Sequence, residues 1–318
     1  MYDVTVIGAA ILDVLAHPVN VSELDGRSYP TDGISLTIGG DAANEATTLA
    51  RLGKKVHLIT KVGRDMAGQI LLSHFQENGI STEDSIVEEA LDTGINLVLI
   101  APDAERSFIT NRNGSLRRLA LEDISPEALG KSPLVSFASI FVSPLFDTDA
   151  METLFRSIKE KGAVLCADMT RCKNGETIRD IQPALAHLDY LFPNYEEAKA
   201  VSGWTEPEEI ADAFLEAGVS NIVIKLGAKG CFLKNSREAL LIPAYPGTNC
   251  VDTTGAGDNF AAGFLYALSE GMEPGDCARF ATAAASIAVE SVGACTGIRS
   301  PEPVLERFHR LQKLSAIS

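Results

Sequence analysis

The stretch that most constrains this chain is residues 252–258, which read Asp-Thr-Thr-Gly-Ala-Gly-Asp and precede an apolar run at residues 260–265. Small residues ahead of a helix-like pattern predict a tight loop that opens a helix. The main-chain N–H groups of Gly255, Ala256 and Gly257 can then converge on an anion, and the partial positive charge of the helix start adds to that attraction. The stretch therefore predicts an anion site of the kind that binds phosphate.

Asp258 is the last residue of this stretch, and its role has two interpretations. A carboxylate would repel an anion held beside it, so its position favours a base that takes a proton from a hydroxyl during phosphoryl transfer. The alternative is a helix N-cap, because small residues and Asp are common ahead of helices. Both interpretations stay open on this stretch alone.

Composition excludes some partners. The 318 residues are 46% hydrophobic, which is enough for a large buried core. Lys and Arg total 27 against 43 Asp and Glu, so the net charge of -16 disfavours nucleic acid and anionic membranes as partners. An anionic substrate would need local help from glycines, helix starts, a divalent cation or a few basic residues.

The start of the chain reads as a strand with no basic leader, and no apolar run reaches membrane-spanning length. We therefore expect a cytoplasmic protein that does not enter a membrane. Six cysteines are scattered without a Cys-x-x-Cys pair, so we expect reduced thiols, with neither a zinc site nor a disulfide framework.

Strand and helix patterns alternate along the chain, which predicts an α/β fold with a parallel sheet. A hairpin signal at residues 93–100 and 106–110 interrupts this alternation. With the turn-rich segment before it, we expect a small antiparallel lid built from residues 14–36 and 93–112. No linker divides the chain, so residues 1–318 are expected to form one main domain. The expected strands are 3–8, 35–38, 56–62, 134–142, 163–167, 190–192, 221–225 and 231–233, and the expected helices include 149–161, 257–269, 274–291 and 301–314.

Polar or small residues follow the first strands at the edge where α/β sheets bind ligands. Asp13 is either a sugar hydroxyl contact or a solvated loop residue. Gly39 and Gly40 would let a ligand approach the main chain, or they form a simple glycine-rich turn. Asn44 lies about one turn into the next helix, where its amide can both donate to and accept from a polyol.

Later strand ends repeat this pattern. Asp168 and Arg171 could meet a substrate or phosphate oxygen, or form a salt bridge that holds their loop. Asn194 and Glu197 have capping-box spacing, and the same pair could hold water around Mg²⁺, so both roles can coexist. The glycines at residues 227–230 are more typical of a hairpin than of a nucleotide site.

Taken together, these motifs resemble the ribokinase-like, or PfkB, family of carbohydrate kinases in order and spacing from residue 3 to about residue 300. The resemblance implies a three-layer α/β/α sandwich with a mostly parallel central sheet and a small β-sheet lid. It also implies an enzyme that uses ATP and Mg²⁺ to phosphorylate an alcohol group of a small carbohydrate, and a homodimer through the lid.

The resemblance also implies roles for individual residues. Asp258 becomes the catalytic base, and Gly255, Ala256 and Gly257 form the anion hole. Glu197 would act on Mg²⁺ through water, and Asp252 either contributes to a K⁺ site or caps its own loop. The implied substrate residues are Asp13, Gly39, Gly40, Asn44, Arg106, Asp168 and Arg171, and the implied nucleotide residues are Asn194, Lys225, Gly227 and Gly230.

Two departures bear on the substrate. Residues 168–171 resemble the Asp-Pro-Asn-x-Arg segment of fructokinase-like and 2-keto-3-deoxygluconate kinase-like members, with Met and Thr in place of Pro and Asn. Asp41 stands where ribokinase-like members have Lys, which counts against ribose. An acid there also disfavours an anionic sugar unless Arg106, Arg112 or Arg171 offsets it.

Three other functions are alternatives for a chain with these motifs. A nucleoside kinase would use the same machinery on a different acceptor, and a catalytically silent sugar-binding regulator would keep the fold without turnover. Asp258 argues against the silent regulator. An NAD-dependent oxidoreductase lacks its Gly-x-Gly-x-x-Gly fingerprint, because Ala9, Ala10 and Ile11 follow Gly8.

Overall fold

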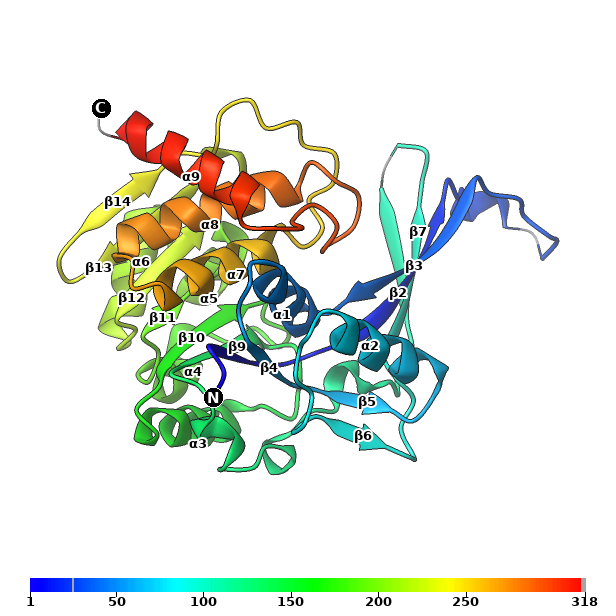
Figure 1. The fold of residues 1–318 in the computed structure, drawn as a ribbon, viewed down its shortest axis with the longest axis horizontal. Helices are drawn as coiled ribbons and strands as arrows, with labels where there is room; N and C mark the ends of the chain where they lie inside the picture. Colours follow the sequence, from blue (N-terminus) through cyan, green and yellow to red (C-terminus); the bar gives the residue numbers. More distant parts are fainter. Residues whose placement is uncertain (25, 104, 316–318) are drawn as a thin grey trace.

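The computed structural model describes residues 1–24, 26–103 and 105–315 of the chain. Its centre is an eight-stranded sheet with the order β14-β13-β12-β11-β10-β9-β1-β4 (Figure 1). The strands from β12 to β4 are parallel, and β13 pairs antiparallel with both of its neighbours. Their bounds are β1 (Val4–Ile7), β4 (Val56–Ile59), β9 (Leu134–Ile140), β10 (Val164–Met169), β11 (Tyr190–Leu191), β12 (Asn221–Lys225), β13 (Cys231–Asn235) and β14 (Ala239–Ile242).

Helices cover both faces of this sheet, so its inner strands are buried on both sides rather than on alternate residues, and all seven residues of β9 are buried. Two large apolar clusters lie on opposite faces. The expected three-layer α/β/α fold is therefore confirmed (Figure 1). One face carries α1 (Asp41–Arg51), α2 (Met66–Glu77), α7 (Ala256–Ser269), α8 (Pro274–Ala288) and α9 (Glu302–Ser315), and the other carries α3 (Thr148–Glu160), α4 (Ile178–Leu185), α5 (Tyr195–Ser202) and α6 (Pro207–Glu216).

A second sheet projects from one end of this body (Figure 1). It has the order β3-β2-β7-β8, with bounds β2 (Ile11–His17), β3 (Gly33–Gly39), β7 (Ile95–Ile100) and β8 (Arg106–Thr110). The expectation of an antiparallel sheet was wrong in one pairing, because β2 and β7 run parallel. The chain passes through the main body between these strands, which lets β7 enter the sheet in the same direction as β2.

The segment at 56–62, expected as one strand, is two strands in different sheets. After β4 the chain leaves the main sheet at Thr60, and β5 (Lys61–Gly63) pairs instead with β6 (Ile86–Glu88). The local pattern of residues 56–62 does not reveal such a change of partner, because β4 and most of β5 are buried alike. The short helix α4, which contains Pro183, and α6 were also not predicted. Short 3₁₀ helices among the described residues are η1 (Val21–Glu23), η2 (Ser115–Arg117), η3 (Leu121–Asp123), η4 (Ala128–Gly130) and η5 (Gly227–Lys229).

Within the described ranges, the helices fall short of the length and apolar character that crossing a bilayer requires. The cytoplasmic location expected from the sequence stays a prediction.

Candidate active site

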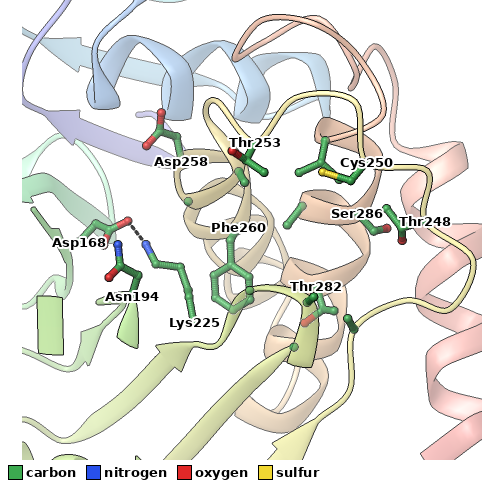
Figure 2. Close-up of a pocket in the computed structure, with 18 of the residues that line it drawn as sticks. Asp168, Asn194, Lys225, Thr248, Cys250, Thr253, Asp258, Phe260, Thr282 and Ser286 are labelled. Atoms are coloured by element: carbon green, nitrogen blue, oxygen red, sulfur yellow. Dashed lines mark hydrogen bonds and ion pairs between the residues drawn. The ribbon is translucent and has the colours of Figure 1, made fainter. Parts of the chain in front are cut away.

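Two adjoining cavities lie where the parallel strands end and α7 begins, the edge at which open α/β sheets bind ligands. The larger cavity has a volume of about 730 Å³ and the smaller one about 360 Å³. Asp41, Thr170 and Asp258 line both. Asp258 therefore stands where the two cavities meet, and Figure 2 shows it at the start of α7 beside the larger one.

The start of α7 is open to an anion. Gly255 has φ 72°, and a Cβ there would lie 2.6 Å from the Cβ of Ala294. Of the expected anion-hole donors, the N–H of Ala256 is already used, because it donates to Thr253 O at 3.2 Å. In the described part of the chain, no protein acceptor contacts the N–H groups of Gly257 and Asp258. A Cβ at Gly257 would lie 3.1 Å from Lys225 Nζ, so glycine leaves this space free. The donor set fits a phosphate oxygen.

The carboxylate of Asp258 does not cap its helix. The N-cap of α7 is Gly255, and no side chain caps this end. Asp258 instead accepts a hydrogen bond of 2.6 Å at Oδ2 from Asn44 Nδ2, and Cys295 Sγ donates to Asn44 Oδ1 at 3.0 Å. This chain of contacts orients the Asn44 amide and holds the Asp258 carboxylate at the cavity junction.

The surroundings of Asp258 make its charged form costly. Burial raises its pKa well above the ordinary value for Asp, and the nearby charge of Asp41 raises it further. Asp41 accepts a hydrogen bond from Ser139 Oγ, yet burial keeps its pKa raised as well. Glu45, fully buried in α1, also has a pKa raised by burial, although Ser136 Oγ donates to it at 2.7 Å.

Lys225 is the cation of this junction. Its Nζ lies 2.5 Å from Asp168 Oδ2, as the dashed line in Figure 2 marks. Burial opposes the ammonium charge, but Asp168 and Glu197 raise the pKa of Lys225 on balance. The salt bridge expected between Asp168 and Arg171 was wrong, because Asp168 is the fifth residue of β10 and pairs with Lys225, whereas Arg171 is exposed.

Asn194 and Glu197 form a capping box at the start of α5. Asn194 Oδ1 accepts from the N–H of Glu197 at 2.9 Å, and Glu197 Oε2 accepts from the N–H of Asn194 at 2.8 Å. Both residues also line the larger cavity, and burial raises the pKa of Glu197 to about 7. The capping role is confirmed, and the role towards Mg²⁺ stays a prediction.

The smaller cavity is bounded by Asp13, Gly40 and Asn44. Asn96 Nδ2 donates to Asp13 Oδ1 at 3.0 Å. Gly39 is required because a Cβ there would lie 2.2 Å from Asp13 Oδ2, and Gly40 has φ 91° with its Cβ position 2.6 Å from Ala9 O. The paired glycines therefore bring β3 and α1 against Asp13, and Gly39 itself does not line the cavity.

Asp252 clamps the loop in front of α7. Its Oδ1 accepts from the N–H of Thr254 at 2.9 Å and from Arg106 Nη2 at 2.6 Å, and its Oδ2 accepts from the N–H of Gly293 at 2.9 Å. Although burial opposes its charge, these donors lower the pKa of Asp252 to about 2. Neither Asp252 nor Arg106 lines the two cavities. Loop capping accounts for these contacts, and the K⁺ site stays a prediction.

Several lining residues were not predicted. Asn96 had a signal, since it is the one amide in the apolar strand β7. Arg117 and Lys173 belong to no recognisable sequence motif. Residues 244–250 lie in an irregular segment, and only the folded structure shows that it reaches the cavity. Further lining residues of the larger cavity, several of them labelled in Figure 2, are Tyr245, Thr248, Cys250, Thr253, Phe260, Thr282 and Ser286.

Comparison with known proteins agrees with this geometry. The family model for pfkB family carbohydrate kinase matches residues 1–301. A ribokinase from Bacillus subtilis is 28% identical over 311 residues, covering 96% of this chain and 99% of that protein. A 5-dehydro-2-deoxygluconokinase from Clostridium perfringens is 26% identical over 319 residues, covering 96% of this chain and 92% of that protein.

The crystal structure of a ribokinase from Thermotoga maritima is similar with a TM-score of 0.81 at 28% identity, covering 98% of this chain and 100% of that one. The family resemblance expected from the motifs is thereby confirmed. The chain belongs to the pfkB family of carbohydrate kinases, phosphotransferases that act on an alcohol group.

Proposed function

We propose that this enzyme transfers the γ-phosphoryl group of ATP to a hydroxyl of a small carbohydrate, with Asp258 as the general base. The observation that carries the proposal is the position of Asp258 between two cavities, beside unpaired N–H groups at the start of α7. A proton acceptor next to an anion site, with separate space for two substrates, is the arrangement that phosphoryl transfer needs.

In this proposal the sugar lies in the smaller cavity and ATP in the larger. The acceptor hydroxyl gives its proton to a carboxylate oxygen of Asp258. Its oxygen bonds to the γ-phosphorus as the bond from that phosphorus to the bridging oxygen breaks, and ADP leaves. Asn44 holds Asp258 in place, and the N–H groups of Gly257 and Asp258 stabilise the charge on the transferred group.

The larger cavity supports the proposal for ATP and Mg²⁺. Lys225 and the start of α7 provide positive charge for phosphates, and Gly227 and Gly230 lie on the cavity wall. Glu197 and Asn194 would hold Mg²⁺ through water, and the ion would neutralise charge on the phosphate oxygens. The K⁺ site near Asp252 belongs to this proposal only as an untested addition.

The second sheet is proposed to act as a lid over the sugar and as a dimer surface. By strand register Asp13 and Asn96 share one of its faces. Ile34, Leu36 and Ile109 share the opposite face and are 70%, 57% and 58% exposed. An apolar sheet face exposed to this degree favours a second copy of the chain as its partner.

A screen of acceptors tests this function. Purified protein is incubated with ATP, Mg²⁺ and one sugar, sugar acid or nucleoside at a time, and ADP formation is measured. We expect turnover with a fructokinase-like or 2-keto-3-deoxygluconate kinase-like acceptor in preference to ribose. Preferred turnover of a nucleoside would make the enzyme a nucleoside kinase, and absence of turnover with every acceptor would favour a silent sugar-binding regulator.

A further inference from the structure

Two basic side chains line the smaller cavity without a role in the proposed transfer. Arg117 ends η2, and Lys173 follows β10, so separate parts of the chain bring them to the same cavity. In the ranges that the structure describes, neither head group has a hydrogen bond or an ion pair with the protein. Both are exposed at the cavity rim, where a ligand can reach them.

The other basic groups of the site each have a direct carboxylate partner. Lys225 pairs with Asp168 at 2.5 Å, and Arg106 pairs with Asp252 at 2.6 Å. Burial lowers the pKa of Lys173, and the charge of Arg117 lowers it further, so the two cations act on each other. An anion between them would relieve this repulsion and gain charge-assisted hydrogen bonds to both.

The acidic side chains of the cavity do not exclude such an anion. Asp13 accepts a hydrogen bond from Asn96, and Asp258 lies where the proposed phosphoryl transfer takes place. Asp41, the acid that counted against an anionic sugar, accepts a hydrogen bond from Ser139 Oγ. Glu176 is turned into its own loop, where it accepts from the N–H groups of Lys173 and Asn174.

We propose that the phosphoryl acceptor is a sugar acid whose carboxylate binds between Arg117 and Lys173 while a hydroxyl at its other end lies at Asp258. This inference rests on the proposed sugar kinase function and specifies its substrate class. A single negative charge suits a cavity that already contains three acidic side chains, Asp13, Asp41 and Asp258. A phosphate monoester, with about two negative charges, would meet stronger repulsion from them.

The test compares acceptors that share a carbon chain. ADP formation is measured with D-gluconate against D-glucitol, with 2-keto-3-deoxy-D-gluconate against its methyl ester, and with D-fructose against D-fructose 6-phosphate. We expect kcat/KM to be higher for the free acid in at least one acid pair. We also expect Arg117→Gln and Lys173→Gln each to lower kcat/KM for that acid by about ten- to a hundredfold, mainly through KM.

One control variant sharpens this test. Arg118→Gln removes a positive charge beside Arg117 from an exposed residue that lines neither cavity, and it should leave the preference for the acid unchanged.

The outcomes separate the two proposals. The neutral partners could have the higher kcat/KM, and Arg117→Gln and Lys173→Gln could leave the ratio of kcat/KM between acid and neutral partner unchanged. That result would overturn the sugar acid proposal, while the kinase proposal would stand. Preference for D-fructose 6-phosphate would overturn the carboxylate assignment in the same way. Absence of turnover with every acceptor would overturn the proposed function, and the sugar acid with it.

Discussion

At the scale of single residues, the site depends on carboxylates held close together. Asp258 and Asp41 line the same cavity junction, and burial raises the pKa of both. The charge of Asp41 raises the pKa of Asp258 further, and the charge of Asp168 does so for Asp41. The motif around Asp258 was predictable because a small-residue loop ahead of a helix is a local pattern. Arg117, Lys173 and Cys295 were not predictable, since their relation to the site depends on contacts between distant segments.

The charge of Asp41 gives a testable pH dependence. A base works in its deprotonated form, so activity is lost as the pH falls through the raised pKa of Asp258. Asp41→Asn removes a charge that raises this pKa, and we expect the acid limb of the kcat/KM profile to move to lower pH. Asp149→Asn, an exposed residue of α3, serves as the control. An acid limb at the same pH in Asp41→Asn and the native enzyme would contradict the electrostatic coupling.

At the scale of elements, the start of α5 could be predicted from its own residues, whereas the partners of several strands could not. The capping box of Asn194 and Glu197 was predictable because both hydrogen bonds form within four residues. The division of residues 56–62 between β4 and β5 was missed, because the choice of partner strand depends on distant residues such as those of β6. The parallel pairing of β2 with β7 was missed for the same reason.

Glu197→Gln tests whether the start of α5 does more than cap a helix. Gln retains the capping hydrogen bond but loses the charge, so Tm should change little. If Glu197 orients water around Mg²⁺, turnover should fall about ten- to a hundredfold and recover in part at higher Mg²⁺.

The chain offers a matched control at a second capping box, formed by Thr177 and Asp180 at the start of α4. Asp180→Asn should leave the Mg²⁺ dependence of turnover unchanged. If turnover of Glu197→Gln depends on Mg²⁺ as turnover of the native enzyme does, Glu197 acts only as a helix cap.

At the scale of the whole molecule, alternation of strands and helices was enough to predict a three-layer fold, because helices that connect parallel strands must cover the faces of the sheet. The arrangement of strands in the second sheet was harder to predict from the sequence. Its segments were recognised from a hairpin signal, but its strand order and the apolar face with Ile34 and Leu36 follow from pairing across distant residues.

The exposed face of this sheet predicts self-association. Leu36→Glu would place a charge on the apolar face, so we expect the native chain to sediment as a dimer and this variant as a monomer. Leu241→Glu is the matched control, because Leu241 is 65% exposed on β14 in the main sheet and should leave the dimer intact. A native chain that sediments as a monomer, or a dimer in Leu36→Glu, would rule out this interface.

The central claim is that Asp258 is the base of a sugar kinase, and turnover of Asp258→Asn tests it most directly. The amide preserves the shape of the side chain and removes the proton acceptor. With the preferred acceptor, kcat should fall by about a hundred- to ten-thousandfold, while calorimetric affinities for acceptor and ATP stay close to native values. A variant that keeps near-native kcat would contradict the account.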